Sequence, residues 1–131
     1  MKYYENEYAL VNHDPEKSLV EIVWKNEEHV QSYPFVLAKA VAVSKQHKVS
    51  KWYADMTALT FVSDQAQTWI KEILFPNICD AEVQRFAIVV SPDLIEKYIS
   101  EAHELENTAK EYGFQSNYFA QADDAKRWLK I

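Results

Sequence analysis

The chain has 131 residues, of which 48% are hydrophobic, 14% aromatic and 26% charged. This composition is typical of one globular domain spanning 1–131, with enough apolar surface to form a core without metal or disulfide cross-links, and it excludes a disordered tail. The net charge of −6 disfavours nucleic-acid binding, because an acidic chain repels the phosphate backbone.

The first elements form a hairpin followed by a helix. Strand-like apolar segments at 8–11 and 19–24 flank the segment 13–17, whose Asp-Pro start is typical of a turn, so we expect an antiparallel pair. Apolar residues then recur at helical spacing from about His29 to His47, with Pro34 in the first turn, where proline is tolerated. This spacing predicts the first helix.

The middle of the chain alternates strands and helices. Residues 51–56 read as a short aromatic strand, and an apolar stripe that includes Trp69 predicts a helix that begins near Ser63 or Asp64 and ends before Pro76. We expect Trp69 to lie in the core. The continuous apolar run at 85–90 indicates a parallel strand covered on both faces.

The last third predicts a long helix, a strand and a closing helix. An apolar helical face runs from Leu94 to Tyr112, where Gly113 is suited to the residue after the helix end. The aromatic pair Tyr118 and Phe119 suggests a strand, and 122–129 reads as a short helix. This order predicts an α/β sandwich with a mixed, mostly parallel sheet and about four helices.

With that order, the sequence resembles the STAS (SpoIIAA-like) superfamily, in particular its small stand-alone bacterial members. The resemblance covers nearly the whole chain, and its more distinctive residues are Asp55, Trp69, Pro76 and the final pair Trp128 and Leu129. It implies a SpoIIAA-like sandwich and a non-enzymatic role as a protein-interaction or small-ligand-binding module in bacterial regulation. The fold alone does not establish that role.

One departure from the family pattern concerns regulation. Anti-sigma-factor antagonists carry an Asp-Ser-Ser-Gly-like motif whose serine is phosphorylated, and the corresponding stretch here is Ser63, Asp64, Gln65 and Ala66. Gln65 takes the position of the phosphoserine and has no hydroxyl group. We therefore predict that phosphorylation at the family position is lost, although Ser63 keeps a hydroxyl that phosphate can modify.

A polar loop after the third predicted strand is the main candidate binding site for a ligand or partner. It lies at the carboxyl end of a presumed parallel strand, where open α/β sheets bind ligands, and a helix follows it. The alternative, which we prefer, is local: Ser63 or Asp64 caps that helix while Asp55 and Thr57 satisfy loop amides, and capping alone explains these residue types. The candidate residues are Asp55, Thr57, Thr60, Ser63 and Asp64.

Other chemistry lacks its signatures in the sequence. Gly113 is the single glycine and Cys79 the single cysteine, which excludes glycine-rich phosphate loops, intramolecular disulfides and Cys-x-x-Cys sites. The four histidines have no metal-ligand spacing. We therefore expect no enzyme activity, no cofactor and no metal. Two alternatives stay open: an apolar-ligand carrier resembling CRAL-TRIO domains, and an enzyme that pairs Asp55 with a histidine brought near by folding.

Partners and location follow from the surface. No stretch approaches the roughly 18–20 apolar residues that span a bilayer, and the amino-terminal segment has no apolar core, so we expect a cytoplasmic protein. We expect either a protein partner or a small apolar ligand. We also predict a weak or stable homodimer formed through an exposed part of the sheet or an apolar helix face.

Overall fold

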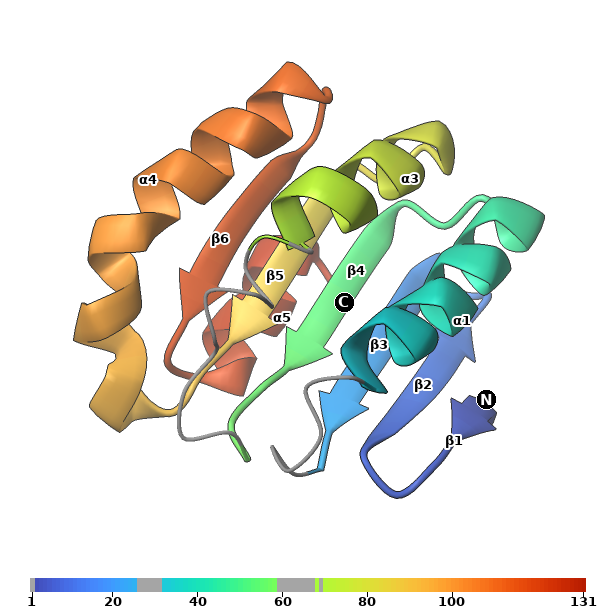
Figure 1. The fold of residues 1–131 in the computed structure, drawn as a ribbon, viewed down its shortest axis with the longest axis horizontal. Coiled ribbons are helices and arrows are strands. Elements are labelled where there is room, and N and C mark those ends of the chain that lie inside the picture. Colours follow the sequence, from blue (N-terminus) through green and yellow to red (C-terminus); the bar gives the residue numbers. More distant parts are fainter. Residues whose placement is uncertain (1, 26–31, 59–67, 69) are drawn as a thin grey trace.

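The computed structural model describes residues 2–25, 32–58, 68 and 70–131, and shows an α/β fold around one mixed six-stranded sheet (Figure 1). The strands lie side by side in chain order, from β1 to β6. They are β1 (Lys2–Glu5), β2 (Ala9–Asp14), β3 (Leu19–Trp24), β4 (Lys51–Asp55), β5 (Arg85–Val89) and β6 (Gln115–Phe119).

The predicted hairpin and the parallel strands are confirmed. β2 pairs with β3 in antiparallel register, with Ala9 opposite Trp24, and β3 to β6 are parallel. β2 is longer than predicted and reaches Asp14, so the turn begins only at Pro15. An additional strand, β1, pairs antiparallel with β2.

Helices cover both faces of the sheet unequally. α1 (Ser32–His47), the π-helical segment η1 (Ile70–Leu74), α3 (Phe75–Asp80) and α4 (Ile95–Glu111) pack on one face, whereas α5 (Ala122–Leu129) packs on the opposite face (Figure 1). The 3-10 turn η2 (Pro92–Leu94) leads into α4. We call these the helix face and the α5 face.

The prediction that the second helix ends before Pro76 is wrong. The chain stays helical from Ile70 through Asp80, and the turn changes from π-helical to α-helical between Leu74 and Phe75. Pro76 therefore lies in the first turn of α3, directly after the π-helical turn. The predicted start of this helix, and Trp69 with it, lie outside the described residues.

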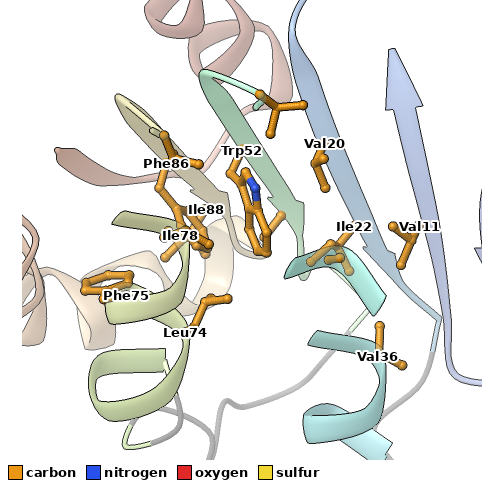
Figure 2. Packing of buried hydrophobic residues seen from close by; sticks show 14 of the residues in the cluster. Val11, Val20, Ile22, Val36, Trp52, Leu74, Phe75, Ile78, Phe86 and Ile88 are labelled. Carbon is orange, nitrogen blue, oxygen red and sulfur yellow. The ribbon is translucent and has the colours of Figure 1, made fainter. Parts of the chain in front are cut away.

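The main core fills the helix face. Trp52 of β4 is fully buried among aliphatic side chains from β2, β3 and the helices, and its ring centroid is 5.5 Å from that of Phe86 (Figure 2). Its indole Nε1 donates to Ser44 Oγ at 2.8 Å, and Ser44 Oγ donates to the Ala40 carbonyl at 2.7 Å. The buried indole thus keeps its hydrogen bond, as burial of a polar group requires.

A smaller cluster fills the α5 face. Tyr53, Ala87 and Val89 of the sheet pack against Ala125 and Leu129 of α5. Burial along the strands follows this coverage: β2 alternates buried and half-buried residues, whereas four consecutive residues of β5 are buried. Alternation is typical of a strand covered on one face, and a continuous apolar run of a strand covered on both.

Each α-helix among the described residues is followed by one residue in the left-handed conformation. Lys48, Glu82, Gly113 and Lys130 have φ values of 51°, 69°, 87° and 62°. After α4, the Gly113 N–H donates to the Lys110 carbonyl and the Phe114 N–H to the Ala109 carbonyl, the hydrogen-bond pair of a Schellman cap. Gly113 therefore occupies the predicted position after the helix, while the other three caps use residues with side chains.

Candidate functional site

The predicted polar loop begins with a local turn. Asp55 is the last residue of β4, and its Oδ1 accepts hydrogen bonds from the Thr57 N–H at 3.0 Å and from Thr57 Oγ1 at 2.7 Å. This is an Asx-type turn, in which a carboxylate satisfies the amide two residues later. Thr60, Ser63 and Asp64 lie outside the described residues, as does Gln65.

A larger feature lies between two helices of the helix face. A groove of about 420 Å³ runs between α1 and the η1–α3 helix. Its walls are mainly aliphatic, and Ile73 at its rim is 47% exposed. The lining residues are Leu37, Ala38, Val41, Ala42, Lys45, Ile73, Leu74 and Asn77.

One end of this groove carries a cation. Lys45 Nζ donates to Asn77 Oδ1 at 3.0 Å, and Asn77 Nδ2 donates to the Ile73 carbonyl at 2.7 Å, which fixes the amide. Among the described residues, Lys45 forms no ion pair with a carboxylate. An aliphatic floor that ends at an ammonium group without a counter-charge is suited to a small amphipathic anion.

Sequence reasoning missed the groove because it assigned Leu37, Val41, Ile73 and Leu74 to core stripes. Only Leu74 of these is fully buried. The sequence does carry a signal: apolar residues occur around most of α1, more than one packing face requires. A helix with apolar residues outside its core-facing stripe has a second apolar surface, which a ligand or a partner can cover.

Folding also brings two histidines together. His13 on β2 and His47 at the end of α1 stack with ring centroids 4.5 Å apart and planes tilted by 30°. His13 is 5% exposed, and burial, followed by the charge of His47, lowers its pKa. A cavity of about 240 Å³ beside the pair is lined also by Lys2, Tyr3 and Pro15.

This pair does not complete an acid–base site with Asp55. His13 lies near the end of β2 that adjoins the start of β3, whereas Asp55 pairs with Val23 at the far end of the parallel strands. Stacked rings also direct their nitrogens side by side and not toward one point. Within 2–25, 32–58, 68 and 70–131, no group of three or more His, Cys, Asp or Glu side chains is placed to hold a metal ion.

The surroundings of Tyr53 and Cys79 favour a structural role for both residues. Burial, together with the carboxylates of Asp55, Glu21 and Asp123, raises the pKa of Tyr53 to about 12, so its phenol is neutral near pH 7. Cys79 is half-buried, and its Sγ donates to the Tyr112 carbonyl at 2.9 Å. A thiol held as a hydrogen-bond donor is not poised as a thiolate nucleophile.

Comparison of the chain with protein-family models, with curated proteins and with solved structures found no match. In the part of the chain that the structure describes, no helix combines the length and the apolar character needed to cross a bilayer.

Proposed function

We propose that this chain is a non-enzymatic small-ligand-binding module of STAS-like fold, and that the α1–α3 groove is its ligand site. The observation that carries the proposal is the aliphatic groove of about 420 Å³ with Lys45 at one end. Its volume lies within the range of small-molecule sites, which are mostly apolar with a few placed polar groups.

The chemistry of the groove selects the ligand class. The floor contributed by Leu37, Val41 and Leu74 favours an aliphatic body, because burying apolar surface contributes about 25 cal/mol per Å². The Lys45 ammonium and the fixed Asn77 amide then favour a carboxylate at one end. We infer that the ligand is a small aliphatic carboxylate.

An open groove favours a binding module over an enclosed carrier. A carrier that shields an apolar ligand from water requires a closed cavity, whereas Ile73 at the rim of this groove remains 47% exposed. A bound ligand would leave part of its surface visible to a protein partner. Such a surface fits a role in regulation, which is the role that the STAS resemblance implies.

Titration with sodium decanoate, followed by amide chemical shifts of the labelled protein, tests the proposal. We expect saturable shifts in α1 and α3, and weaker binding by roughly two- to fivefold in Lys45→Gln, the effect of losing one exposed charged contact. Lys17→Gln makes the same charge change in the hairpin turn and should bind normally. Decanol should bind the wild type and Lys45→Gln alike.

A second variant separates loss of binding from loss of fold. Ala38 is an exposed residue of the groove on α1, and Ala38→Glu places a carboxylate on the aliphatic wall at a helix-compatible position. We expect this variant to keep the wild-type midpoint of urea unfolding and to lose decanoate binding. Shifts confined to other elements, or binding unchanged in Ala38→Glu, would overturn the proposal.

A further inference from the structure

The described sheet has two edges with very different protection. At one edge, β1 has only four residues, and its register with β2 shifts between Lys2 and Tyr4. Lys2 Nζ donates to Glu5 at 3.2 Å, and Lys25 also forms an ion pair with Glu5. Short length, irregular register and charge are the features that keep an edge strand from pairing with another chain.

The opposite edge, β6, has five residues and lacks the charge and the irregular register. Its sequence, Gln115 to Phe119, contains no charged residue and no proline, and it pairs with β5 without a register shift. The Gln115 N–H donates to the Gln84 carbonyl, and the Phe119 carbonyl accepts from the Val90 N–H, so these residues turn toward β5. Backbone groups alternate along a strand, so the N–H and C=O of Ser116 point away from the sheet.

Ser116 lies at the bottom of a hollow at this edge. The whole residue, backbone included, is 5% exposed, and its Oγ has no hydrogen-bond partner among the described residues, which is rare for a buried hydroxyl. A hollow of about 150 Å³ lies beside it, lined by Glu106 and Lys110 of α4, by Gln115, Ser116 and Asn117, and by Trp128 of α5. Since α4 and α5 cover opposite faces, a hollow that touches both opens at the β6 edge.

We propose that β6 is a homodimer interface, at which β6 of a second copy pairs antiparallel around Ser116 and joins the two sheets. The two Ser116 residues would exchange N–H to C=O hydrogen bonds. The same register places Gln115 opposite Asn117 of the second copy, so that side-chain amides face each other twice. The pairing extends the sheet by strand addition, a common mode of recognition at free edges.

The charges beside the edge identify a second copy as the occupant. Glu106 and Lys110 have opposite charges and lie one turn apart on α4, and in the described part of the chain neither forms an ion pair. A two-fold axis brings residue i of one copy to residue j of the other and the reverse. In the proposed pairing around Ser116, we place Glu106 of each copy beside Lys110 of the other, so that the opposite charges of this rim complement one another.

Sedimentation equilibrium over micromolar to millimolar concentrations tests the interface. We expect the wild type to dimerise and Asn117→Lys to remain monomeric, because a lysine on an edge strand blocks pairing. Tyr3→Lys adds the same charge at the protected β1 edge and should dimerise as the wild type does. A wild type that stays monomeric throughout, including one that binds a foreign β-strand peptide, would overturn the proposal.

A mixing experiment tests the charge pairs in trans. Glu106→Lys and Lys110→Glu should each weaken self-association on the order of tenfold, because both contacts become repulsive. Their equimolar mixture should form heterodimers, in which both contacts are again opposite in charge, and native mass spectrometry of the mixture would detect them. Each variant should unfold near the wild-type urea midpoint when dilute. Failure of the mixture to form heterodimers would contradict the two-fold contact.

Discussion

The hydrophobic cluster on one face of the sheet is much larger than the cluster on the other face. The helix face holds a continuous core in which Trp52, Phe75 and Phe86 pack with the aliphatic residues of β2, β3 and three helices (Figure 2). The α5 face holds a small cluster beneath one helix of eight residues, over β4, β5 and β6. We therefore expect packing on the helix face to contribute most of the free energy of unfolding. We expect the α5 face to open more easily.

Coverage also divides the sheet along its width. α5 does not extend over the hairpin, where a polar hollow of about 330 Å³ is lined by Asn12, Glu21 and Lys126, among others. Three half-buried residues, Asn12 and Asp14 of β2 and Glu21 of β3, line this hollow. β2 and β3 therefore have one face that is covered from solvent, whereas β4 and β5 are covered on both faces.

The strongest test of this comparison is Trp52→Ala. The indole is fully buried between sheet and helices, and its removal leaves a large cavity and takes away the hydrogen bond that Ser44 Oγ accepts, while its bond to the Ala40 carbonyl remains. We expect a loss of about 3–5 kcal/mol in the free energy of unfolding, measured by urea denaturation. A loss below about 1 kcal/mol would mean that the helix face does not carry the stability assigned to it.

A smaller effect is expected from Leu129→Ala on the α5 face. Leu129 is fully buried, but the cluster around it is small and lies beneath one helix of eight residues, so its surroundings can collapse into the space. We expect a loss of about 2–3 kcal/mol, near the lower limit for a buried leucine. Amide hydrogen exchange should accelerate in α5 before it does in α1. Equal acceleration in both helices would show that the two faces unfold as one unit.

The smallest effect concerns the titration of His13, a polar group buried on the helix face. Its pKa in the folded chain is lowered from 6.5, so the unfolded chain binds the proton more readily. Stability is therefore complete above about pH 6.5 and falls as the pH decreases below it. Urea midpoints measured between about pH 5 and pH 7 should show this slope.

His13→Asn is the matched control for that slope. The variant has no group that titrates in this range at position 13, so its urea midpoint should change less with pH than that of the wild type. The ion-paired Glu5 also has a lowered pKa, but from 4.5, so its effect appears at more acidic pH. Identical slopes for the variant and the wild type would show that His13 is not the group responsible.

The sequence predicted those elements whose burial is strong and regular. The runs at 19–24 and 85–90 are apolar because both correspond to central strands, and Gly113 marks the end of α4 because a left-handed residue is needed there. β1 escaped prediction because Tyr3 and Tyr4 stand between charged residues and their strand is defined only by pairing with β2. The extension through Pro76 depends on a π turn that periodicity does not reveal.

The sites were less predictable, because they depend on contacts distant in sequence. His13 and His47 are 34 positions apart and meet only after α1 packs on the hairpin. The groove requires α1 and α3 to lie side by side. Lys45 is held at one end of it by a hydrogen bond to Asn77 on the other wall. By contrast, Asp55 and Thr57 interact within one turn, and their residue types alone indicated a polar loop.

The left-handed caps show how a chain with a single glycine differs in folding energetics from a chain with many glycines. The four α-helices in the described part of the chain each end with a left-handed residue, and three of them use lysine or glutamate, at a conformational cost of about 1–2 kcal/mol per site in the folded chain. A chain with so few glycines, however, has fewer backbone states when unfolded and loses less entropy on folding. Lys48, Glu82 and Lys130 therefore raise the conformational energy of the folded chain, whereas the low glycine content lowers the entropy of the unfolded chain.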